Sequence, residues 1–177
     1  MNAYTSCECI DKSIKLSHNN IVNTSLIKVC AFFGHRKIIN KQSIQSQLIL
    51  IIKDLIENKG YKRFLFGGLG EFDDLCYQIV SSYKQQYSDI VRVFYLFDKK
   101  HINERKRPKY ISKELYEEII YAQVDFDYWY YYIYYRNLTI VDNSDMIVFY
   151  VNHSEESGAY KIYKYAKKKN KNIILLS

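Results

Sequence analysis

The sequence predicts an α/β fold: one three-layer domain with a mostly parallel, doubly wound sheet. Two observations lead to this fold class. First, short apolar runs typical of buried strands alternate along the chain with stretches in which apolar residues recur at helical spacing. Second, two of these runs lead into glycine-containing turns, at Gly34 and at residues 67–70, and each turn lies between a strand and a helix. The 177 residues are enough for one such domain with a sizeable core.

The first half of the domain is expected to hold three strands and two helices. Continuous apolar runs predict strands at 26–33, 62–66 and 90–96. A helix at 41–59 is predicted because apolar residues from position 44 to position 56 recur every three or four residues, and Gly60 ends it. The same spacing at 75–83 predicts a helix after the second glycine turn.

The second half is expected to add three helices and two strands. Ser112 is a suitable N-cap for a helix that runs through Tyr121, with Glu114 and Glu117 near the positive end of its dipole. Hydrophobic periodicity predicts further helices at 127–141 and 158–169, and strands at 146–151 and 172–176.

Composition limits the class of protein. Residues 1–25 are polar and aperiodic, which predicts a flexible N-terminal arm before a domain at 26–177. The chain has no run of 18 apolar residues and no signal-peptide pattern at its start, so we expect a cytoplasmic protein without membrane contact. Cys30 and Cys76 lie at apolar positions and are expected to be buried. The other two cysteines are too close in sequence for a zinc knuckle, so we expect neither a metal nor a cofactor.

The net charge of +7 is concentrated in two clusters. Residues 161–171 carry six lysines, which helical spacing places on a solvated face. Residues 99–113 carry seven Lys or Arg and one Glu after a predicted strand. They either supply counter-charge to a phosphate ligand or form a solvated loop. Nucleic-acid binding is a third, less favoured alternative, because the sequence has no recognised binding motif.

The tyrosine-rich run at 128–135 has two interpretations. Its rings could stack on a base or on single-stranded nucleic acid. On a helix, however, these rings point in all directions, and a helix that is aromatic on every face is typical of a subunit interface. We therefore expect a homo-oligomer.

Both glycine turns have the composition of a phosphate site. Glycine lets the backbone approach an anion, and the N–H groups at a helix start attract negative charge. Four motifs occur in order at the predicted strand ends: residues 30–36 (CAFFGHR), 64–73 (FLFGGLGEFD), 136–145 (RNLTIVDNSD) and 157–159 (SGA). Over residues 28–176 the chain resembles the YpsA-like branch of the SLOG superfamily, distantly related to the LOG phosphoribohydrolases and to DprA. The resemblance implies a Rossmann-like domain whose ligand is a nucleotide or a nucleotide-derived molecule.

The resemblance also assigns a site. The ligand-binding residues that it implies are Gly34, His35, Arg36, Gly67, Gly68, Gly70, Glu71, Asp73, Arg136, Asn137, Ser157 and Gly158. In a LOG hydrolase the glycine turn continues into a threonine and a catalytic glutamate, and this chain has Glu71 and Asp74 at those positions. Asp74 is one methylene shorter than glutamate, and misplacement by ~1 Å can cost ~100-fold in rate. Hydrolysis with Asp74 or Glu71 as the catalytic group therefore ranks below binding.

Several of these residues also have a structural interpretation. His35 contacts a ligand phosphate or fixes its turn through backbone hydrogen bonds. Arg36 and Arg136 are suited to bind phosphate, but either could pair with Asp73 or Asp142 instead. Asp73 is favoured as an acid at a helix start that orders the glycine loop, over a role as general base.

We expect the protein to bind a nucleotide-type signal, as a sensor, between the Gly34, Gly67 and Gly158 turns. Two alternatives stay open. One is a phosphoribohydrolase-like enzyme that releases the base from a nucleoside monophosphate. The other is a protein or nucleic-acid interaction module that acts through the tyrosine-rich helix and the basic loop.

Overall fold

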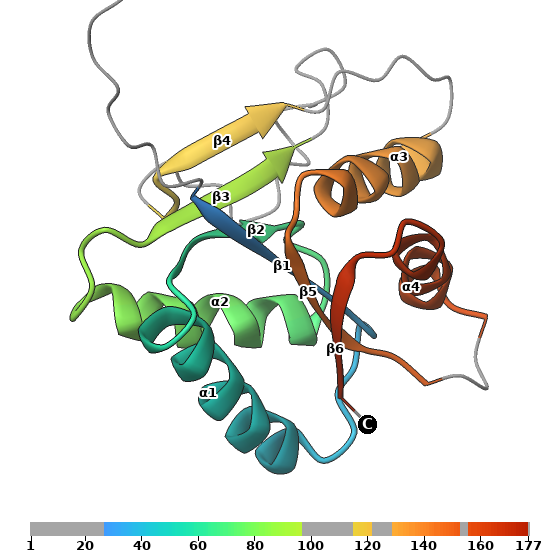
Figure 1. The fold of residues 1–177 in the computed structure, drawn as a ribbon. Coiled ribbons are helices and arrows are strands. Elements are labelled where there is room, and N and C mark those ends of the chain that lie inside the picture. The colour runs from blue at the N-terminus through green and yellow to red at the C-terminus, as the bar shows by residue number, and fades with distance from the viewer. Residues whose placement is uncertain (1–26, 97–114, 122–128, 153–155, 177) are drawn as a thin grey trace, which may run out of the picture.

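A central sheet, parallel throughout, organises the protein (Figure 1). The computed structural model describes residues 27–96, 115–121, 129–152 and 156–176. The six strands among these residues are β1 (Lys28–Gly34), β2 (Tyr61–Phe66), β3 (Val91–Leu96), β4 (Glu118–Tyr121), β5 (Met146–Tyr150) and β6 (Asn172–Leu176). They are arranged in the order β4-β3-β2-β1-β5-β6. This is the α/β fold class that the sequence predicts.

Within the described ranges, two helices cover each face of the sheet (Figure 1). Helices α1 (Lys41–Glu57) and α2 (Glu71–Lys84) lie on one face. Helices α3 (Trp129–Asp142) and α4 (Gly158–Lys168) lie on the other. The five predicted strands and these four helices match the predictions to within two residues at each end, except that α2 begins at Glu71, four residues before its predicted start.

The core consists of two apolar layers, one on each side of the sheet. Alternate residues of β1 divide between them: Cys30 and Phe32 pack under α1 and α2, whereas Ala31 and Phe33 pack under α3 and α4. Because both faces are buried, the strands read as continuous apolar runs. Cys30 and Cys76 are both fully buried, as predicted, and burial raises the pKa of both thiols.

The order of the strands creates a crevice. From β1 the chain moves outward through β2, β3 and β4, and it then returns to add β5 and β6 on the other side of β1. Strands β1 and β5 are direct neighbours, with Gly34 in register with Tyr150. In open α/β sheets, ligands bind outside the carboxyl ends of the strands at such a reversal. The crevice therefore lies where β1 and β5 end.

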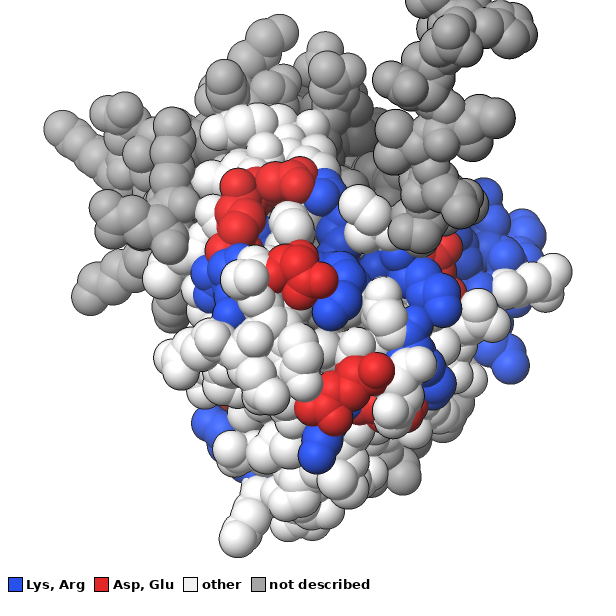
Figure 2. Space-filling view, turned by 60° about the vertical axis from the view of Figure 1, so that its left-hand side comes forward, with Lys and Arg blue, Asp and Glu red and all other residues white. Residues whose placement is uncertain are grey.

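The helix predicted at 112–121 is wrong for the residues that the structure describes. Glu118–Tyr121 forms β4, which extends the sheet beyond β3. Of the two acids that favoured a helix start, Glu114 lies outside the described residues, and Glu117 instead accepts from the Arg92 guanidinium at 2.7 Å. The neighbouring Glu118 accepts from Arg63 at 2.6 Å. Figure 2 shows that basic and acidic side chains lie among one another on one face of the protein.

Other sequence-based predictions fall partly on described residues. The lysines at 161, 164, 167 and 168 are exposed on α4, as predicted. Tyr132 is buried on α3, whereas Tyr131, Tyr134 and Tyr135 are each about 40% exposed. The arm at 1–25 and the whole basic cluster at 99–113 lie outside the described residues. No helix within the described ranges is long and apolar enough to cross a membrane.

Candidate functional site

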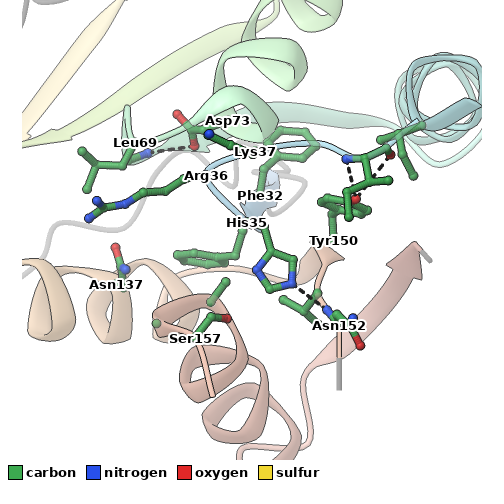
Figure 3. A pocket seen from close by; sticks show the side chains of 18 of the residues that line it. Phe32, His35, Arg36, Lys37, Leu69, Asp73, Asn137, Tyr150, Asn152 and Ser157 are labelled. Carbon is green, nitrogen blue, oxygen red and sulfur yellow. Dashed lines mark hydrogen bonds between the residues drawn. The ribbon is translucent and has the colours of Figure 1, made fainter. Parts of the chain in front are cut away.

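A cavity of about 1020 Å³ lies at the carboxyl ends of β1 and β5 (Figure 3). Its walls come from the end of β1, the loop to α1, the turn after β2, the middle of α3, the end of β5 and the start of α4. The lining combines apolar side chains such as Phe33 and Ile133 with polar and charged groups. A cavity of this size and mixed lining, at this place in the fold, is typical of a small-molecule site.

His35 joins the loop after β1 to the end of β5. Its backbone N–H donates to the Tyr150 carbonyl at 3.1 Å, and its Nε2 accepts from the Asn152 N–H at 2.7 Å (Figure 3). Because Nε2 accepts an amide proton, the neutral ring carries its own proton on Nδ1. The Tyr150 hydroxyl continues this link by accepting from the Ile39 N–H at 3.0 Å. His35 therefore fixes its turn, although its ring also lines the cavity.

The turn after β2 is closed by its own acid. Asp73, on the first turn of α2, accepts from the Gly68 N–H at 2.7 Å and from the Gly67 N–H at 3.3 Å. Gly68 has a φ of +67°, and a Cβ there would lie 2.4 Å from the Phe94 ring. The Arg136 guanidinium donates to the Gly67 carbonyl at 2.8 Å. The turn is thus held on both sides by buried charged groups.

Asp73 and Arg136 are among the few buried charged residues, at 6% and 2% exposure. Burial raises the pKa of Asp73 to about 6, although the two glycine N–H groups and the charge of Arg136 oppose this shift. Burial also lowers the pKa of Arg136 to about 10, opposed by Asp73. At neutral pH both groups are charged. Arg136 also donates to the Asn137 side chain at 3.0 Å, which orients that amide at the cavity wall.

The exposed positive charge of the lining lies on the loop after β1. Arg36 and Lys37 are exposed on the loop after β1, and both line the cavity. Helices α1 and α4 begin at the cavity and have no acid in their first turns, whereas α2 has three. Ser157 caps α4 by accepting from the Tyr160 N–H at 3.1 Å. The electrostatic asymmetry favours an anionic group near α1 and α4.

The two candidate catalytic acids lie outside the cavity lining. Glu71 accepts from the Ile38 N–H at 3.0 Å, and its own N–H donates to the Arg36 carbonyl at 2.9 Å. Glu71 thus braces the loop after β1. Asp74 is half-buried; burial raises its pKa, Lys41 lowers it and Glu71 raises it further. Neither carboxylate is placed among the groups that would contact a cavity ligand.

Nine of the twelve predicted ligand residues line the cavity, and Gly68, Gly70 and Glu71 do not. Gly70 has a φ of +102°, and a Cβ there would lie 2.7 Å from the Arg36 Cα, so it permits close approach of two loops. Sequence reasoning missed several polar lining residues: Lys37, Asn40, Ser43, Tyr150 and Asn152. The sequence could have indicated these residues only by their position, because each follows β1 or β5 or lies at the end of one of these strands, where the strand order reverses.

The described part of the chain contains no group of three or more His, Cys, Asp or Glu side chains that could hold a metal ion. No protein-family model and no curated protein matches the chain. Among solved structures, the chain is similar to the X-ray structure of TM1055, a Northeast Structural Genomics Consortium target. The TM-score is 0.51 at 17% identity, over 82% of this chain and 72% of the other. Together with the parallel sheet and its reversal at β1, this similarity shows that the chain has a Rossmann-like α/β fold.

Proposed function

We propose that the protein binds a nucleotide or nucleotide-derived small molecule in this cavity and acts as a sensor or signal-binding protein. The observation that carries the proposal is the meeting of three turns at one cavity: Gly34, Gly67 and Gly158 all line it. We further propose that the chain belongs to the YpsA-like branch of the SLOG superfamily, on the motifs that contain these turns.

The chemistry of the lining supports a nucleotide. Arg36 and Lys37 offer cations to a phosphate, and the acid-free starts of α1 and α4 add a favourable dipole. The apolar side chains can contact a base, and the Asn137 amide can hydrogen-bond with a base or a sugar.

Binding is a better match to this site than base release. The hydrolase alternative needs a carboxylate that reaches the bond to be cleaved. Asp74 and Glu71 are outside the lining. The carboxylate that does line the cavity, Asp73, already accepts two backbone hydrogen bonds. We expect a bound nucleotide to be released intact.

The experiment is a thermal-shift screen of the purified chain against nucleoside phosphates, ADP-ribose forms and cyclic nucleotides, with native mass spectrometry of the complexes. Arg36→Ala should weaken binding by about 10- to 100-fold, because it removes charge-assisted hydrogen bonds. Lys168→Ala is the matched control, since Lys168 is exposed near the far end of α4 and should leave affinity unchanged. The proposal fails if no nucleotide stabilises the wild type. The sensor assignment fails if native mass spectrometry detects the released base in place of the intact nucleotide.

A further inference from the structure

The turn after β2 contains its own anion. Asp73 is 6% exposed, and its carboxylate accepts the N–H groups of Gly67 and Gly68. These are the N–H groups that a strand–glycine–helix turn would offer to a phosphate. The carboxylate therefore takes the position of a phosphate at this turn.

The charge of Asp73 is already opposed by a cation of the protein. Arg136 is 2% exposed, donates to the Gly67 carbonyl, and favours the ionised form of Asp73. Glu71 and Asp74 add two more acids to the same first turn of α2. A second anion that approached this turn would meet negative charge and N–H donors that already have acceptors.

The loop after β1, which packs against Gly70 of this turn, has the reverse character. Arg36 and Lys37 are exposed there, and within the described residues neither side chain has a hydrogen bond or an ion pair. Ser43 from the first turn of α1 and Gly158 from the first turn of α4 also line the cavity. The exposed cations of the lining thus belong to the loop after β1, and the acid-free helix starts are those of α1 and α4, whereas the first turn of α2 carries three acids.

We propose that Asp73 is a specificity-determining residue that excludes phosphate from the Gly67–Gly68 turn and selects a ligand with a single anionic group. This inference rests on the proposed function. The anionic group of the ligand binds to Arg36 and Lys37, and a neutral donor of the ligand, such as a sugar hydroxyl or an amine, binds to Asp73. Each carboxylate oxygen can accept a second hydrogen bond besides the one from glycine. A nucleoside monophosphate meets these requirements, whereas a diphosphate that spans both turns does not.

The test is a titration of the ¹⁵N-labelled full chain with inorganic phosphate, followed by amide NMR signals. In the wild type we expect the signals of residues 36–38 to move with phosphate, while those of Gly67 and Gly68 stay in place. The inference is overturned if the Gly67 and Gly68 signals move as far as those of the loop, because phosphate would then have displaced Asp73. Adenosine monophosphate should bind at least as tightly as adenosine diphosphate, and a tenfold preference for the diphosphate would also overturn the inference.

Asp73→Asn supplies the complementary test. The neutral side chain no longer repels an anion, so phosphate should now move the Gly67 and Gly68 signals, and inorganic pyrophosphate should bind at least tenfold more tightly than to the wild type. Asp89→Asn is the control, since Asp89 is exposed and pairs with Lys62 away from the cavity. It should reproduce the wild-type pattern.

Different results would overturn nucleotide binding and the role of Asp73. If no nucleotide moves any cavity signal of the wild type, the proposed function fails, and the Asn variant still decides whether Asp73 excludes phosphate. If nucleotides bind but the Asn variant gains no phosphate response at Gly67 and Gly68, the role of Asp73 fails alone. Should the Asn variant not fold, the phosphate titration of the wild type decides.

Discussion

Gly68→Ala should destabilise the protein mainly through a clash with Phe94. Gly68 has a φ of +67°, and an added Cβ would lie 2.4 Å from Phe94 Cε2 and 2.8 Å from its Cζ. Phe94 is 3% exposed and packs against Tyr116 at a centroid distance of 4.9 Å, so it has little room to move. Left-handed backbone costs an alanine roughly 1–2 kcal/mol, and overpacking typically costs a further ~1–3 kcal/mol. Alanine also reduces the conformational entropy of the unfolded chain, which stabilises the folded state by about 0.4–1 kcal/mol.

The net expectation is a loss of about 2–4 kcal/mol in the free energy of unfolding. Gly60→Ala is the matched control, because Gly60 has a φ of +71° but nothing within 4 Å of the position of a Cβ. It should cost only about 1 kcal/mol, since it carries the backbone strain without the clash.

Urea unfolding followed by circular dichroism measures both variants, provided that unfolding is two-state. A third variant, Phe94→Leu, completes a double-mutant cycle with Gly68→Ala, in which the smaller side chain should recover about 1–3 kcal/mol. Equal losses for Gly60→Ala and Gly68→Ala, or a cycle with no coupling, would refute the contribution assigned to the Phe94 clash.

Three further predictions concern the carboxylates and the loop after β1. Burial raises the pKa of Asp73 to about 6 from an ordinary value of 3.8, so the folded state binds this proton more tightly than the unfolded state does. This group therefore lowers stability as the pH rises from about 4 to about 6, by up to roughly 3 kcal/mol. Urea unfolding across that range should show the free energy of unfolding of the wild type falling by this amount relative to that of Asp73→Asn. Glu117→Gln should lower the free energy of unfolding by about 1–2 kcal/mol because it weakens the partly buried pair with Arg92, and a change below 0.3 kcal/mol would contradict the importance of that pair for β4. His35→Ala should speed hydrogen exchange of the Asn152 amide by at least about tenfold, since that N–H loses its acceptor, and unchanged exchange would count against this bond.

The sheet was predictable from the sequence because its signals are local. Strands buried on both faces are continuous apolar runs, and the helices between them carry regular apolar spacing. Strand β4 was not predictable in this way. It is four residues long and lies at the edge, and its acids are held by Arg63 and Arg92 from the neighbouring strands. Those partners are distant in sequence, so the acids of this segment favoured a helix start instead.

The cavity was predictable in position but only partly in its hydrogen bonding. A glycine turn after a strand can be recognised in sequence, and the chain reversal brings such turns together. The sequence favoured Asp73 as the acid that orders the glycine loop, and its carboxylate does accept N–H groups there, but which N–H groups it takes from a ligand depends on its side-chain conformation, which no local pattern specifies. Similarly, the Asn152 N–H reaches His35 across 117 positions of sequence.

These contacts divide the site residues into two kinds with different consequences. His35, Glu71 and Asp73 hold loops through hydrogen bonds to backbone N–H groups, so the free protein already has an ordered cavity rim. Order established by folding does not have to be created on binding, which favours affinity. Removal of one of these three side chains should therefore change both the stability of the free protein and its affinity. Removal of the exposed Arg36 side chain should change affinity alone, so comparing unfolding with binding separates residues that support the cavity from those that contact its ligand.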